Sequence, residues 1–93
     1  MLDELFDIIE ERKRLKPEGS YTNALMQNGE NAILRKIGEE TLEVLLASKD
    51  EGPKRLIEES ADLIYHLFVL LSFKGITLDQ VKQELARRHK GAE

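Results

Sequence analysis

The sequence has 93 residues, a formal net charge of −4 and no cysteine. This length fits a single small domain, 1–93, with a small core for its surface. The acidic balance argues against a protein that binds nucleic acid through phosphate contacts, and the lack of cysteine excludes disulfides, zinc–thiolate sites and cysteine nucleophiles. The acidic N-terminal stretch 1–5 has no character of a signal or transit peptide. We expect a cytoplasmic protein with no nucleic-acid or membrane partner.

The spacing of apolar residues predicts helices in the first half of the chain. Apolar residues at 2, 5, 6 and 9 predict an amphipathic helix over 2–15, which Pro17 and Gly19 end. The segment 20–29 is interpreted as a functional loop that contains one or two helical turns. A second long helix is expected over 30–48, and its apolar stripe consists of Ile33, Ile37, Val44 and Ala47.

The second half of the chain carries clear helix start and stop signals. Pro53 suits the first position of a third long helix, which runs to about residue 74 and stops at Gly75. Thr77 and Gln80 form a capping box that opens a last helix, whose predicted buried face is Leu78, Val81 and Leu85. No alternation typical of strands occurs. The predicted fold is therefore all-α, a helical bundle of about four to five helices.

The third long helix is apolar nearly all the way round between Leu63 and Phe73. This run falls well short of the roughly 20 residues that a bilayer span needs, so it indicates a helix that is buried on every side. The remaining helices of so short a chain are too few to cover it. We therefore expect a second copy of the chain to complete the bundle, as a homodimer.

Each of the two long central helices turns two carboxylates toward its apolar side. At about 100° per residue, Glu40 falls in the middle of the stripe of the 30–48 helix, and Glu43 falls at its edge. On the following helix, Glu59 and Asp62 share a side with the apolar positions. The two helices are joined by a short turn and so are expected to run antiparallel. The four carboxylates then converge.

Converging buried carboxylates repel one another unless a proton or a cation relieves them. An ion-pair network is one solution, but Lys36 is the only basic residue well placed for it by helical spacing, and one lysine does not balance four carboxylates. A divalent cation is the other solution. Oxygen ligands without cysteine suit Mg²⁺, with Mn²⁺ as a possible substitute. Spacing alone leaves both solutions open.

Two acidic motifs on successive helices carry a family resemblance. Glu39-Glu40-Thr41-Leu42-Glu43, followed by Glu59-Ser60-Ala61-Asp62, matches the ExxE-plus-ExxD signature of the all-α nucleotide pyrophosphohydrolases, the MazG-like superfamily. Further matching segments are 20–22, Gly29, 36–40 and 61–66. With these, residues 3 to 88 resemble the phosphoribosyl-ATP pyrophosphohydrolase family of histidine biosynthesis.

The resemblance implies a Mg²⁺-dependent hydrolase. Such an enzyme splits phosphoribosyl-ATP into phosphoribosyl-AMP and pyrophosphate through attack of water at the α–β phosphoanhydride. The resemblance implies that the metal is held by Glu40, Glu43, Glu59 and Asp62. It adds Glu39 as either a further ligand or the base that orients the water, so the expected catalytic residues are Glu39, Glu40 and Glu43.

The next enzyme of the pathway, a cyclohydrolase, is fused to this one in many organisms. That domain needs a zinc site rich in cysteine and histidine. This chain has no cysteine and two histidines, so we expect a stand-alone pyrophosphohydrolase.

Four residues near the start of the motif set are candidate substrate contacts, each with a structural alternative. Lys36 contacts a phosphate or neutralises a neighbouring carboxylate. Tyr21 stacks on a base or ribose, or serves as an anchoring aromatic. Ser20 and Thr22 donate hydrogen bonds to phosphate, or cap the turn.

Two candidates come from the last two helices. His66 lies one turn after Asp62, and it is either a satisfied core histidine or a contact to substrate. Arg88 could reach a phosphate of the substrate bound to the partner subunit, or it belongs to a solvated helix end where a positive charge is favoured.

Three other functions are compatible with parts of the sequence. A housecleaning nucleoside triphosphate pyrophosphohydrolase of the same superfamily would share the four carboxylates. A di-iron carboxylate bundle requires Glu-x-x-His on two helices. In this sequence Leu63 and Ala86 stand three residues before His66 and His89, so neither histidine has the required glutamate. A non-catalytic helical dimerisation module would leave the inward carboxylates unexplained.

Overall fold

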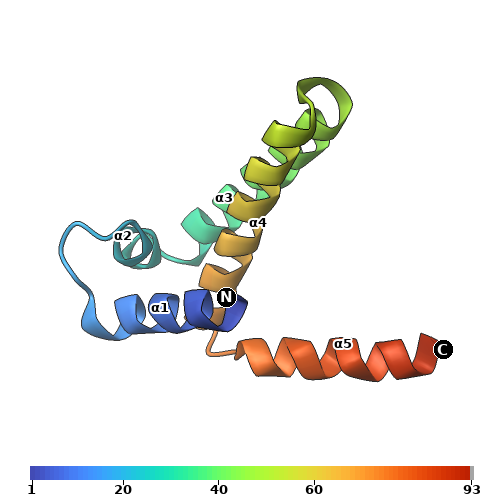
Figure 1. The fold of residues 1–93 in the computed structure, drawn as a ribbon. Coiled ribbons are helices and arrows are strands. Elements are labelled where there is room, and N and C mark those ends of the chain that lie inside the picture. Colours follow the sequence, from blue (N-terminus) through green and yellow to red (C-terminus); the bar gives the residue numbers. More distant parts are fainter. Residues whose placement is uncertain (93) are drawn as a thin grey trace.

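The computed structural model consists of helices alone over the residues it describes, 1–92, with side chains described for 1–89 (Figure 1). The elements are α1 (Leu2–Leu15), α2 (Tyr21–Gln27), α3 (Glu30–Leu46), the π-helical turn η1 (Ala47–Glu51), α4 (Pro53–Phe73) and α5 (Leu78–Ala92). This confirms the all-α prediction, and the expected loop at 20–29 contains the short helix α2.

Helix boundaries follow the local signals in the sequence. α4 begins at Pro53 and ends before Gly75, whose φ of 75° is accessible to glycine without strain. At the start of α5, the Gln80 backbone N–H donates to Thr77 Oγ1 at 3.1 Å, and the Thr77 N–H donates to Gln80 Oε1 at 2.8 Å. The predicted capping box is confirmed.

The core lies where α1, α2 and α3 meet the second half of α4. Phe6 of α1 and Phe68 of α4 pack edge to face, with ring centroids 5.6 Å apart. The buried apolar residues grouped with them are Ile9, Leu25, Ile33, Val69 and Leu78. This small core anchors the base of α4, and the rest of α4 pairs with α3.

α3 and α4 run antiparallel and side by side, joined by η1 and Gly52 (Figure 1). Of the stripe predicted for the 30–48 helix, Ile33 of α3 and Ala47 at the start of η1 are buried, and Ile37 and Val44 are half-buried. The pair projects beyond α1 and α2, which do not cover its outer half (Figure 1). This arrangement brings the two acidic motifs opposite each other.

The single chain does not bury the apolar run of α4 on every side, in agreement with the expectation that its own helices are too few to cover it. Ile64 and Leu67, in the middle of the apolar run, are 39% and 40% exposed. Further large apolar side chains are exposed along the α3–α4 pair, namely Leu42, Leu45, Leu46 and Ile57. α1 and α2 contact this part of α4 at Tyr65, His66 and Phe68, and the side that carries Ile64 and Leu67 is left exposed.

α5 leaves the end of α4 and extends away from the other helices (Figure 1). Leu78 is buried and Val81 is half-buried, but Leu85 is 61% exposed, so the predicted buried face is correct only for the first turn. Across the described residues, no single helix has the length and apolar content of a membrane span. The one pair that reaches both together, α4 with 78–89, is bent by 112°.

Candidate active site

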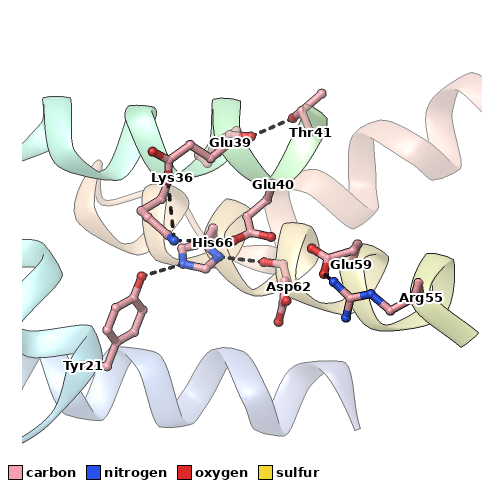
Figure 2. Close-up of polar contacts among 10 residues, drawn as sticks. Tyr21, Lys36, Glu39, Glu40, Thr41, Arg55, Glu59, Asp62 and His66 are labelled. Atoms are coloured by element: carbon pink, nitrogen blue, oxygen red, sulfur yellow. Dashed lines mark hydrogen bonds and ion pairs between the residues drawn. The ribbon is translucent and has the colours of Figure 1, made fainter. Parts of the chain in front are cut away.

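Three carboxylates from α3 and α4 lie together in the structure. Glu40, Glu59 and Asp62 each offer an oxygen within 4.8 Å of the oxygens of the other two. Figure 2 shows Glu40 reaching from α3 toward Glu59 and Asp62 on α4. Glu40 and Glu59 are 9% and 6% exposed, whereas Asp62 is open to solvent. We call these three residues the acidic trio.

The trio forms because of helical spacing and antiparallel pairing. Glu59 and Asp62, three residues apart on α4, face the same side of that helix. Glu40 lies on the face of α3 that also carries the buried Ile33 and that continues into the buried Ala47 at the start of η1. The packing that buries this apolar stripe therefore also presses Glu40 against α4.

The electrostatics of the trio show the cost of this arrangement. Burial raises the pKa of the Glu40 carboxyl, and the adjacent Glu59 and Asp62 raise it further, while Lys36 acts in the opposite direction. Lys36 Nζ lies 3.5 Å from a Glu40 oxygen and 3.6 Å from a Glu39 oxygen. The lysine reduces the repulsion within the cluster without cancelling it.

A second cation, Arg55, borders the trio and was missed from the sequence. Its guanidinium donates to Glu59 at 2.6 Å and to Glu58 at 2.7 Å, and it lies 3.7 Å from Glu51. The prediction that Lys36 is the only well-placed basic residue is therefore wrong. The signal was present in the spacing, because Arg55 precedes Glu59 by four residues as Lys36 precedes Glu40.

His66, one turn after Asp62, is buried and fully hydrogen-bonded. Its Nδ1 lies 2.7 Å from the carbonyl oxygen of Asp62, and its Nε2 lies 2.9 Å from the hydroxyl of Tyr21. Figure 2 shows Tyr21 approaching His66 from α2. Burial raises the pKa of the Tyr21 phenol, with Lys36 acting in the opposite direction. The hydroxyl therefore stays protonated at neutral pH.

The two polar neighbours of Tyr21 are also engaged within the chain. Ser20 is the N-cap of α2, and its Oγ accepts from the Asn23 N–H at 3.2 Å. Thr22 is buried, and its hydroxyl is hydrogen-bonded to the hydroxyl of Tyr65. In this state both side chains make the structural contacts that were the alternative to phosphate binding.

Three other predicted site residues lie outside the trio. Glu43 is half-buried one turn after Glu40, and it has no oxygen that lies within 4.8 Å of all three trio oxygens at once. Glu39 lies on the exposed side of α3 beside Lys36. Arg88 lies on α5, exposed, and its Nε donates to Glu84 at 2.9 Å. α5, which carries Arg88, points away from α3 and α4, the two helices that carry the trio (Figure 1).

The donor set of the trio suits a hard divalent cation. All three donors are carboxylate oxygens, two of them largely withdrawn from water. Neither histidine belongs to the cluster formed by the described residues. This composition does not match the Glu-x-x-His ligands of a di-iron bundle.

Comparison with known proteins identifies the family. Residues 2–89 match the family model described as phosphoribosyl-ATP pyrophosphohydrolase. The chain belongs to this family. Proteins called phosphoribosyl-ATP pyrophosphatase from Metallosphaera sedula and Haloarcula marismortui are 53% and 52% identical to it, each over 90 residues. These alignments cover 97% and 95% of this chain, and 97% and 92% of the two relatives, respectively.

More distant relatives extend the same picture. The phosphoribosyl-ATP pyrophosphatase of Clostridium acetobutylicum is 48% identical over 90 residues, 97% of this chain and 82% of that protein. Membership of the phosphoribosyl-ATP pyrophosphohydrolase family confirms the resemblance and makes the chain an enzyme, a hydrolase of histidine biosynthesis. The roles of individual residues are a separate matter and are proposed below.

Proposed function

We propose that the chain hydrolyses phosphoribosyl-ATP to phosphoribosyl-AMP and pyrophosphate, with Mg²⁺ held by Glu40, Glu43, Glu59 and Asp62. The family match over residues 2–89 supports the substrate and the reaction. The observation that carries the metal assignment is the acidic trio, three ligand oxygens within 4.8 Å of one another from two helices. Glu43 joins them as the next acidic residue on the same side of α3.

A divalent cation fits this site because the charges present there do not balance. The raised pKa of Glu40 shows that its ionised form is disfavoured despite the nearby lysine. When bound, Mg²⁺ would neutralise phosphate oxygens and lower the pKa of a coordinated water. Mn²⁺ has the same preference for oxygen ligands and is the expected substitute.

The residues near the trio are proposed to orient the attacking water and to contact the substrate. Glu39 lies on the exposed side of α3 and shares Lys36 with Glu40. Its proposed role is to orient the attacking water or to add a further ligand. Lys36, already between Glu39 and Glu40, contacts a phosphate of the substrate. The start of α2, Ser20 to Thr22, is bonded to α4 through the contacts of Tyr21 with His66 and of Thr22 with Tyr65. His66 follows the trio residue Asp62 by one turn of α4.

We also propose that the active molecule is a homodimer in the cytoplasm. The exposed apolar side chains along α3 and α4 support this proposal, because a second copy of the chain could cover them. Among them, Ile57, Ile64 and Leu67 lie on α4, the helix that also carries Glu59 and Asp62. Burying them against the partner would remove apolar area from water. In such a dimer, Arg88 on the projecting α5 reaches the substrate of the partner subunit.

The test is release of pyrophosphate from phosphoribosyl-ATP by the purified protein, in Mg²⁺ and in EDTA, beside a panel of deoxynucleoside triphosphates. We expect release from phosphoribosyl-ATP in Mg²⁺ and none in EDTA. Release mainly from the deoxynucleotides would instead assign the housecleaning function. No release from any substrate would leave a non-catalytic helical module and contradict the proposal.

A further inference from the structure

Two consecutive residues of α2 are hydrogen-bonded to two consecutive residues of α4. Tyr21 bonds to His66, and Thr22 bonds to Tyr65. The rings of Tyr21 and Tyr65 also stack, with centroids 6.2 Å apart and planes inclined by 30°. α2 is a helix of seven residues, too short to be stable alone. These contacts therefore fix its first turn on the face of α4.

The direction of the Tyr21–His66 hydrogen bond follows from the other partner of the imidazole. The carbonyl oxygen of Asp62 can only accept, so the Nδ1 that lies 2.7 Å from it carries the hydrogen. In the neutral ring, Nε2 is then a bare acceptor. The Tyr21 hydroxyl, 2.9 Å away, must donate to it.

We infer that His66 is a positioning residue that holds the Tyr21 hydroxyl as a hydrogen-bond acceptor for the substrate. The Tyr21 proton is committed to His66, so only the lone pairs of its oxygen remain available to a ligand. Phosphate oxygens also accept, and they cannot use this oxygen. Its partner must be a donor. On a nucleotide the donors are the ribose hydroxyls and the exocyclic N–H of the base, and of these the hydroxyls lie on the sugar that is bonded directly to the phosphates, so we assign the contact to a ribose hydroxyl. The inference rests on the proposed function and names the group that contacts Tyr21.

The position of the pair ties this contact to the acidic trio. Tyr21 as a whole residue is 51% exposed, whereas His66 is 5% exposed and its Nδ1 is bonded to the backbone carbonyl of Asp62. One turn of α4 thus sets the distance between a trio carboxylate and the Tyr21 oxygen. A ribose held at Tyr21 would be placed in register with phosphates held at the trio.

The tautomer of His66 can be measured without substrate or metal. We expect ¹⁵N NMR of the imidazoles at pH 8 in EDTA to show His66 protonated at Nδ1 and bare at Nε2, with His89→Gln used to assign the two histidines. Tyr21→Phe should shift the Nε2 resonance and leave Nδ1 unchanged. Thr22→Val is the matched control, since it breaks the neighbouring bond and should leave Nε2 in place. Protonation at Nε2, or a Nε2 resonance that Tyr21→Phe does not move, would overturn the inference.

The effect on substrate binding is tested with two single variants and the double variant. His66→Asn keeps a donor for the Asp62 carbonyl but does not reach Tyr21. Tyr21→Phe and His66→Asn should each raise KM for phosphoribosyl-ATP by roughly five- to tenfold, the value of one hydrogen bond, with kcat nearly unchanged. The double variant should be no worse than either single variant.

The kinetic result separates positioning from general damage. Effects that multiply in the double variant, or a fall in kcat at constant KM, would contradict the inference. A wild-type protein that releases no pyrophosphate would contradict the proposed function instead. The NMR result stands in either case, so the two failures are distinguishable.

Discussion

The guanidinium of Arg55 lies 2.6 Å from the carboxylate of Glu59, one helical turn later on α4. On α3 the same spacing joins Lys36 to Glu40, at 3.5 Å. The two most buried carboxylates of the trio are thus each paired with a cation from their own helix. The ion-pair network and the metal site, which spacing alone left as alternatives, therefore share the same carboxylates.

Removing Arg55 should have opposite effects on the two states of the site. Without metal, Arg55→Gln leaves the buried Glu59 with less compensation, so its melting temperature should fall. With Mg²⁺, the variant has lost a competing cation, so its apparent Kd should decrease by roughly two- to fivefold. Thermal melts over a Mg²⁺ titration measure both effects.

The control for Arg55 is Lys54→Gln, which removes a cation from an exposed neighbouring position of α4. It should change neither the melting temperature nor the Kd by a comparable amount. A weaker Mg²⁺ affinity in Arg55→Gln would indicate that the arginine supports the metal-bound state.

The trio carboxylates are expected to be essential for stabilisation by metal. Glu40→Gln and Glu59→Gln should each abolish the rise in melting temperature that Mg²⁺ produces in the wild type, and should lower kcat/KM by at least about a hundredfold. In EDTA the same variants should be as stable as the wild type or more so, because substitution relieves repulsion.

Glu58→Gln is the matched control for these variants, since Glu58 lies next to Glu59 on the exposed side of α4 and shares its arginine. It should retain the Mg²⁺-dependent rise and most of the activity. Full retention of that rise in Glu40→Gln would rule out a metal at the trio.

The raised pKa of Glu40 predicts how stability depends on pH in the absence of metal. The folded state holds the proton of Glu40 more tightly than the unfolded state, whose carboxyl titrates near its ordinary value of 4.5. The free energy of unfolding therefore decreases as pH rises from about 4.5 through the higher folded pKa of Glu40. Below both pKa values the carboxyl is protonated in the folded and the unfolded state, and Glu40 does not destabilise the fold.

Comparing Glu40→Gln with the wild type isolates that contribution. In EDTA the variant should be more stable than the wild type by about 1 kcal/mol at pH 7.5, and the difference should vanish toward pH 4.5. Urea unfolding at a series of pH values measures it. A difference that is constant with pH would show that Glu40 titrates alike in the folded and unfolded protein.

The exposed apolar side of α4 predicts the state of association. A charge at Ile64, Ile64→Asp, should convert a dimer to monomers and lower stability, because it places a carboxylate in the proposed contact. Sedimentation equilibrium of the two proteins measures the change. Leu15→Asp, at an exposed position at the end of α1, should leave the association unchanged. A wild-type protein that sediments as a monomer would contradict the homodimer.

Most of the fold was predictable because helices depend on local signals. Pro53, Gly75 and the Thr77–Gln80 capping box act through neighbouring backbone groups, so their effects are visible in the sequence. The same is true of the placement of Glu40 and Glu59 on buried helix faces, which requires only helical periodicity and a short connection. The burial of Leu85 was predicted wrongly, because periodicity says which side of a helix is apolar and not whether another helix covers it.

The sequence by itself determined the helices, the family and the four acidic positions. Only the tertiary structure decided that Glu40, Glu59 and Asp62 bring their oxygens together while Glu43 remains outside this trio. It also decided that Tyr21 and Thr22 are bonded to α4 rather than free in a loop. These contacts join residues more than 40 positions apart, as in the pair Tyr21 and His66. Their geometry depends on how α2, α3 and α4 pack, a long-range property that local periodicity does not contain.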